Sequence, residues 1–204
     1  MSLLFVTGTG TEIGKTWFAS RLIAELVARG VPVAARKPAQ SFEPGTGPTD
    51  ADLLGAASGE DPRTVCPDHR WYEVPMAPPM AAAVLGRPGI TVAELVAECA
   101  PGPVDGITLV EGAGGPRSPI ATDGDSIDLA RALGAERVLL VADAGLGTIN
   151  AVRLCVEALR GFPVLVALNR FDPADDLQRR NLAWLEEHGF AVTTDPADAA
   201  ERLR

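Results

Sequence analysis

Short runs of apolar, often β-branched residues alternate along the chain with longer segments of helical spacing. The apolar runs cover residues 3–7, 31–36, 107–111, 138–143, 164–169 and, more weakly, 190–193. Helical spacing covers about 14–29, 50–58, 91–99, 126–134, 148–160 and 175–188. Strands that alternate with helices are typical of parallel sheets. We therefore predict an α/β fold in which helices flank a mainly parallel sheet.

Two segments fit neither pattern. Residues 38–48 are rich in glycine, proline and small polar residues, and residues 62–79 combine many prolines with aromatic residues. Glycine and proline at this density indicate turns, so we predict a surface loop in each segment. Long loops in compact domains often carry function.

Size and composition favour one domain that spans residues 1–204. The chain has 204 residues, of which 47% are hydrophobic, enough to form a substantial core without disulfides or structural metals. Its net charge of -9 and its pI near 4.7 disfavour nonspecific binding to nucleic acid or anionic lipid. We predict no nucleic-acid partner and no membrane partner.

Cysteine usage and the N-terminal sequence indicate a cytoplasmic protein. Cys66, Cys99 and Cys155 lie far apart without paired metal-ligand spacing, which favours reduced thiols. No basic region precedes the first apolar run, and no apolar segment reaches membrane-spanning length. Neither export nor membrane insertion is expected.

A glycine-rich segment lies between the first predicted strand and the first predicted helix. Residues 8–16 read Gly-Thr-Gly-Thr-Glu-Ile-Gly-Lys-Thr. In such a turn, backbone N–H groups converge on phosphate oxygens, and the helix N-terminus and a lysine add positive potential. Lys15 is placed to contact phosphates, and the Thr16 hydroxyl is placed to bind Mg²⁺ between them. The sequence therefore predicts a nucleoside triphosphate ligand, bound by a loop one residue longer than the usual motif.

Further polar residues follow the other predicted strands. Glu111 ends the run 107–110 and Lys37 ends the run 31–36, and ligands of parallel sheets bind at these carboxyl ends. A carboxylate there suits Mg²⁺, and a lysine suits charge on a transferred phosphoryl group. Asp50 or Asp52, at the start of a helix, is a second acidic candidate. Each of these residues could instead be a solvated side chain or a helix N-cap.

Four motifs together resemble the dethiobiotin synthetase family. They are Gly8–Thr16 with its additional residue, Lys37-Pro38, Glu111–Gly115 and Leu146–Asn150. The resemblance runs in order from residue 4 to about residue 172, and the longer loop is the form this family uses. It implies a three-layer fold of the P-loop NTPase type. It also implies an ATP- and Mg²⁺-dependent homodimer that converts 7,8-diaminononanoate and CO₂ to dethiobiotin.

The resemblance assigns roles to individual residues. The nucleotide phosphates would be bound by Glu12, Ile13, Gly14, Lys15 and Thr16 of the phosphate loop. The nucleotide base would be contacted by Asn169. Mg²⁺ would be held by Thr16, Asp50 and Glu111, where Asp50 is preferred over Asp52 by its spacing to Ser58-Gly59. Lys37 and Lys15 would be the catalytic residues.

Substrate binding is assigned in the same way. Thr11, Lys37 and Ser41 would line the diamine site. The substrate carboxylate would bind at a helix N-terminus supplied by the opposite subunit, at Gly147, Thr148, Ile149 and Asn150. In the implied reaction, an amine and CO₂ form a carbamate, the carbamate attacks the γ-phosphate, and the second amine closes the ring.

The sequence departs from the family pattern in three places. Gly10 stands where an acidic residue is frequent, Ala151 stands where a histidine is frequent, and a late segment that helps to hold the base is absent after residue 172. The preference for ATP over CTP or GTP is therefore open. The segment 169–172 also resembles a guanine-reading motif, which is the less favoured interpretation.

Two alternative functions share the phosphate loop. A partitioning-type ATPase switch predicts a basic surface or an amphipathic terminal helix, and the acidic composition favours neither. A related amidoligase predicts a source of ammonia such as a glutaminase domain, which this sequence does not contain.

Overall fold

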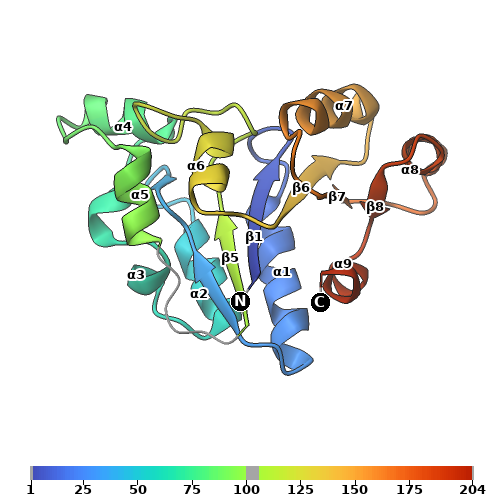
Figure 1. Ribbon diagram of the computed structural model, residues 1–204, viewed down its shortest axis with the longest axis horizontal. Helices are drawn as coiled ribbons and strands as arrows, with labels where there is room; N and C mark the ends of the chain where they lie inside the picture. The colour runs from blue at the N-terminus through green and yellow to red at the C-terminus, as the bar shows by residue number, and fades with distance from the viewer. Residues whose placement is uncertain (1, 100–105, 204) are drawn as a thin grey trace.

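The fold is built on a parallel sheet, and the computed structural model describes residues 2–99 and 106–203. Six strands lie in the order β2-β5-β1-β6-β7-β8, and neighbouring strands of this described sheet pair in parallel (Figure 1). They are β1 (Ser2–Gly8), β2 (Val33–Arg36), β5 (Ile107–Glu111), β6 (Arg137–Asp143), β7 (Val164–Asn169) and β8 (Ala191–Thr193). The predicted strands are thus confirmed.

Alternate side chains of each strand pack into two cores, one on each face of the sheet. In β1, Leu4 and Val6 belong to one core, whereas Leu3 and Phe5 belong to the other. The first core also receives α1 (Lys15–Ala28), α2 (Asp50–Ser58), α3 (Pro62–Val65) and α9 (Pro196–Arg202). The second receives α4 (Pro78–Val84), α5 (Val92–Glu98), α6 (Ser126–Ala132), α7 (Thr148–Ala158) and α8 (Asp176–Glu187). This arrangement confirms the predicted three-layer α/β fold.

Three short helices, α3, α4 and α9, lie where the sequence pattern predicts none. Each has a proline in its first turn, at Pro62, Pro78 and Pro196. Proline is tolerated there because its φ suits a helix and its missing N–H has no intrahelical acceptor to lose. None of the described helices is both long enough and apolar enough to cross a membrane.

The prediction of a surface loop over residues 62–79 is wrong. This segment contains α3, the 3₁₀ helix η1 (Asp68–Arg70), the strand β4 (Trp71–Tyr72) and the start of α4. β4 pairs with β3 (Gln40–Ser41) in a second, two-stranded sheet. The segment 38–48 is irregular apart from β3.

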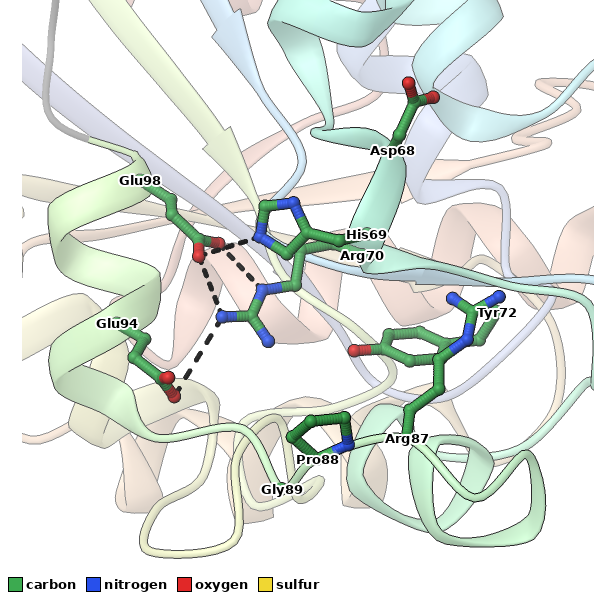
Figure 2. Close-up of a pocket in the computed structure, with 9 residues that line it drawn as sticks. All are labelled: Asp68, His69, Arg70, Tyr72, Arg87, Pro88, Gly89, Glu94 and Glu98. Carbon is green, nitrogen blue, oxygen red and sulfur yellow. Dashed lines mark hydrogen bonds and ion pairs between the residues drawn. The ribbon is translucent and has the colours of Figure 1, made fainter.

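An ion pair attaches η1, and with it β4, to α5. The Nε and Nη2 atoms of Arg70 donate to the two carboxylate oxygens of Glu98 at 2.7 and 2.8 Å (Figure 2). The Arg70 side chain is only 7% exposed, so this pair is shielded from water. Burial acts to raise the pKa of Glu98, but hydrogen bonds from Arg70 and His69 outweigh it and hold that pKa below its usual value.

We predict that Glu98→Gln lowers the free energy of unfolding by about 2 kcal/mol at neutral pH, because the Arg70 guanidinium then keeps only the longer ion pair with Glu94, at 3.9 Å. The folded-state pKa of Glu98 is depressed, so its contribution is present above the unfolded pKa of about 4.3 and is lost as the pH falls through the folded pKa. Urea denaturation of both proteins at several pH values measures the difference.

Glu157→Gln is the control for this substitution, because Glu157 pairs with Arg160 on the surface of the protein. Exposed pairs of this kind contribute only a few tenths of a kcal/mol. A difference between wild type and Glu98→Gln that stays constant well below pH 4 would contradict the prediction.

Candidate functional site

Residues 8–16 run from the last residue of β1 through the turn into the first residues of α1. They are fixed by hydrogen bonds from the segment itself and from the end of β7. Two residues take left-handed backbone conformations, Glu12 with φ 58° and Gly14 with φ 84°. Asn169 Nδ2 donates to the backbone carbonyl of Ile13 at 2.9 Å, and Lys15 Nζ donates to that of Gly10 at 2.9 Å. The predicted phosphate loop therefore has a defined shape at the N-terminus of α1.

Thr16, Lys37, Asp50 and Glu111 meet beside this loop. The Thr16 hydroxyl lies 2.7 Å from Asp50 Oδ1 and 2.8 Å from Glu111 Oε1. Lys37 Nζ lies 2.6 Å from Asp50 Oδ2 and 2.7 Å from Glu111 Oε1. The alternative acid, Asp52, accepts the backbone N–H of Thr49 and belongs to the capping box of α2. Of the two acids, Asp50 is the one that reaches this cluster.

The parallel sheet explains why residues so distant in sequence meet. β5 lies between β2 and β1, so Lys37 follows one neighbour of β5 and the phosphate loop follows the other. Glu111 is the last residue of β5 and pairs in register with Val6 of β1. The carboxyl ends of three adjacent strands therefore deliver the lysine, the acid and the loop to one edge.

Burial and charge shift the pKa values of this cluster in opposite directions. Burial acts to lower the pKa of Lys37, but the charges of Asp50 and Glu111 outweigh it, so its pKa is raised. Burial likewise acts to raise the pKa of Asp50, but Lys37 holds it below its usual value. Burial raises the pKa of Glu111, which is 0% exposed, despite the neighbouring Lys37. Lys37 thus stays an ammonium at neutral pH.

The donor set suits a hard cation such as Mg²⁺. Two carboxylates and a hydroxyl converge, and Glu111 Oε2 is buried without a hydrogen-bond partner among the residues that the structure describes. Mg²⁺ is usually bound by one or two carboxylates together with substrate phosphates and water. Within residues 2–99 and 106–203, no three His, Cys, Asp or Glu side chains cluster as a metal site. A cation here would therefore depend on Thr16 and on phosphate oxygens for further ligands.

A cavity of about 660 Å³ opens beside these side chains. Its wall includes the predicted residues Thr11, Glu12, Gly14, Lys15, Thr16, Lys37, Ser41 and Asp50. The Ser41 Oγ atom is buried and has no hydrogen-bond partner in the described part of the chain, so it is open to a ligand. The sequence motifs therefore identify one face of a real cavity.

Part of the cavity lining is identified by the motif Glu111–Gly115, which supplies Ala113 and Gly114 from the turn after β5. The motifs do not identify the remaining lining residues before α4 and farther along that turn: Pro75, Met76, Ala77, Pro78, Ser118 and Pro119. The sequence signal that could have found the residues before α4 is the proline-rich composition of residues 62–79, because the long loops that such composition predicts often carry function. Gln40 also lines the cavity.

The segment Gly147–Asn150 is not brought to this cavity. It forms the start of α7, and none of its residues is in the wall described above. Leu146, just before it, is 91% exposed. Asn169 also lies outside the wall, behind the phosphate loop, where it contacts Ile13.

Lysine is confined to this site in the whole sequence. Lys15 and Lys37 are its two lysines, and every other basic residue among the 18 is an arginine. An ammonium is a compact charge that approaches single oxygen atoms, whereas a guanidinium is broad and planar. Every lysine of the sequence therefore lies in one of two motifs, Gly8–Thr16 or Lys37-Pro38.

The loop between β1 and α1, the parallel sheet and the acids at its edge define a P-loop nucleotide-binding protein. A family model described as an AAA domain matches residues 2–189. The chain is 43% identical over 179 residues to a protein named ATP-dependent dethiobiotin synthetase BioD from Anaeromyxobacter dehalogenans strain 2CP-C, with 85% of this chain and 78% of that protein covered. It is 35% identical over 206 residues to a protein of the same name from Caulobacter vibrioides strain NA1000, with 96% and 93% covered. The chain belongs to the dethiobiotin synthetase family and is an enzyme of the ligase class.

Solved structures support the same fold. Chloroplast FtsY from Physcomitrella patens superposes with a TM-score of 0.50 at 16% identity, covering 97% of this chain and 60% of that one. FtsY from Elizabethkingia anophelis in complex with GDP gives a TM-score of 0.50 at 17% identity, covering 94% and 55%. The chain thus spans little more than half the length of these proteins. At this identity the likeness shows the fold alone.

We predict that Gly14→Ala raises the Kd for Mg·ATP at least about tenfold, because a Cβ at Gly14 would collide with the Asn169 amide that shapes the loop. Gly30→Ala is a matched control: its φ of +77° is similar, but nothing lies within 4 Å of the added Cβ. Both variants should lose about 1 kcal/mol of stability from the left-handed backbone. Calorimetric titration and urea denaturation measure the two effects, and equal Kd values for the two variants would contradict the prediction.

Proposed function

We propose that this protein closes the ureido ring of dethiobiotin from 7,8-diaminononanoate, CO₂ and ATP, in an Mg²⁺-dependent reaction. The observation that carries the proposal is the meeting of Lys37, Thr16, Asp50 and Glu111 beside the phosphate loop and the open cavity. The names of the relatives from Anaeromyxobacter and Caulobacter supply the substrate class.

ATP would lie with its phosphates against the loop. The backbone from Glu12 to Thr16 would surround them, and Lys15 would leave the Gly10 carbonyl to bridge their oxygens. Thr16, Asp50 and Glu111 would hold Mg²⁺, which neutralises phosphate charge in the transition state. The unpaired Glu111 Oε2 supports this assignment.

Lys37 would act as a fixed cation in the phosphoryl-transfer step. One substrate amine attacks CO₂ and loses a proton, giving a carbamate whose oxygen then attacks the γ-phosphorus as the bond to ADP breaks. A carbamate and a triphosphate are both anions, so a positive charge between them lowers the barrier. The raised pKa of Lys37 keeps it protonated, which suits a cation and does not suit a general base.

Ring closure needs positioning more than a catalytic side chain. The second amine attacks the carbonyl carbon of the mixed anhydride, and phosphate leaves. Thr11 and Ser41, on one wall of the cavity, would hold the diamine close to that carbon. The buried and unpaired Ser41 Oγ supports a polar contact there.

We also propose a homodimer in which the start of α7 completes the partner's site. Gly147, Thr148, Ile149 and Asn150 lie outside the cavity of their own chain, so a carboxylate bound there would need a second subunit. Leu146 and Leu154 are 91% and 61% exposed, which supports burial of this surface in an interface. We further propose that the protein is cytoplasmic and that Asn169 contacts the base of the nucleotide.

The reaction is tested with purified protein, diamine, labelled bicarbonate, Mg²⁺ and ATP. We expect labelled dethiobiotin together with ADP and phosphate, and no product without Mg²⁺. Parallel reactions with CTP and GTP determine the nucleotide preference, and we expect ATP to be used. Absence of labelled product under conditions in which a relative forms it would refute the proposed function.

Mixing two inactive variants tests the shared site. We expect Lys37→Ala and Asn150→Ala homodimers to have little activity, because each lacks one part of every site. Refolding them together should restore about a quarter of the wild-type activity, since each mixed dimer contains one complete site. If Lys37 and Asn150 served the same subunit's site, the mixture would stay inactive. Analytical ultracentrifugation confirms that mixed dimers form.

A further inference from the structure

Asp50 contacts the catalytic cluster from the first residue of α2, so the placement of this helix end decides where its carboxylate lies. A helix begins with N–H groups that lack intrahelical acceptors. At α2, the Thr49 hydroxyl accepts the Asp52 N–H at 3.3 Å, and the Asp52 carboxylate accepts the Thr49 N–H at 2.8 Å. This capping box leaves the N–H of Ala51 to be satisfied by another group.

The Gln40 side chain supplies that group. Its Oε1 accepts the Ala51 N–H at 3.0 Å, and its Nε2 donates to the Thr49 hydroxyl at 3.3 Å. Gln40 is only 2% exposed and belongs to β3, whose backbone pairs with Trp71 of β4. Both ends of one buried amide therefore hold the N-terminus of α2 against the two-stranded sheet.

These contacts leave the Asp50 carboxylate free for the site. Its two oxygens accept from Thr16 at 2.7 Å and from Lys37 at 2.6 Å, and neither oxygen caps the helix. Capping is instead performed by the residues on either side of it and by Gln40. We infer that Gln40 is a positioning residue, which fixes the start of α2 so that Asp50 reaches Thr16 and the Mg²⁺ ligand set. This inference rests on the proposed role of Asp50 in binding Mg²⁺.

The strict geometry of Mg²⁺ explains why such a residue matters. Mg²⁺ requires nearly octahedral ligands at about 2.0–2.1 Å, so a small shift of one carboxylate weakens binding. An apolar side chain at position 40 would leave a buried N–H unpaired and would release the helix end from β3. Residues that orient metal ligands typically change metal affinity about 10- to 100-fold when they are removed.

The test compares the Kd for Mg·ATP with the Kd for ATP in EDTA, measured by calorimetry. The ratio of the Kd for ATP in EDTA to the Kd for Mg·ATP gives the preference for Mg·ATP. For Gln40→Leu we expect this ratio to fall about tenfold, with the Kd for ATP alone unchanged. Gln178→Leu is the matched control: Gln178 is the other glutamine of the sequence, and it accepts the Asp172 N–H next to α8. This control should keep the wild-type preference, and an unchanged preference in Gln40→Leu would overturn the inference.

A double-mutant comparison separates positioning from a general effect on stability. If Gln40 acts through Asp50, adding Gln40→Leu to Asp50→Asn should cause no further loss of Mg²⁺ preference. A further loss in the double variant would refute action through Asp50. If Gln40→Leu does not fold, Gln40→Glu keeps an oxygen that faces the Ala51 N–H and should retain at least about half of the wild-type preference. A lower value would contradict the inference.

The outcome for the proposed function is read separately. If Gln40→Leu lowers the preference for Mg·ATP as expected but the wild-type protein forms no dethiobiotin, the proposed reaction is refuted and the positioning role remains. A wild-type protein with no preference for Mg·ATP would contradict the metal role of Asp50 and the role of Gln40 with it.

Discussion

The site depends on one buried cation between two carboxylates. Lys37 is 3% exposed, and its ammonium lies within hydrogen-bonding distance of both Asp50 and Glu111. Two carboxylates this close would repel each other in a medium of low polarity, and a fully buried glutamate strongly favours its neutral form. The lysine offsets this repulsion and holds both acids in place. The same charge also suits the proposed role of the site, in which Mg²⁺ and phosphates bind beside these acids.

The sheet order makes this arrangement possible with short connections. Because β5 lies between β1 and β2, three strand ends deliver the phosphate loop, Lys37 and Glu111 without any long excursion of the chain. Asp50 arrives differently, from a helix that follows an irregular segment and the two-stranded sheet. Its position is therefore the one that needs additional support, and the hydrogen bonds of Gln40 meet this need.

Much of this structure follows from local sequence patterns. The strands of the main sheet and the phosphate loop were predictable because β-branched runs and a glycine-rich turn are local signals. The helices that begin at Pro62, Pro78 and Pro196 are not predictable in this way, since proline is a signal both for a turn and for the first turn of a helix. Composition alone does not separate Asp50 from Asp52, and the preference for Asp50 comes from the family resemblance through its spacing to Ser58-Gly59. The contacts that distinguish them come from Thr16 and Lys37, which lie far away in sequence.

The confinement of lysine to the site has a practical consequence for work on this enzyme. Reagents that acylate lysine side chains will find Lys15 and Lys37 as their targets, and both are buried at the cavity, at 8% and 3% exposure. Acylation needs an accessible and uncharged amine, and Lys37 is in addition held as an ammonium by Asp50 and Glu111. Fluorescent labelling or surface immobilisation through lysine side chains is therefore expected to be slow in the folded protein. A rise in lysine acylation would instead report opening of this part of the fold.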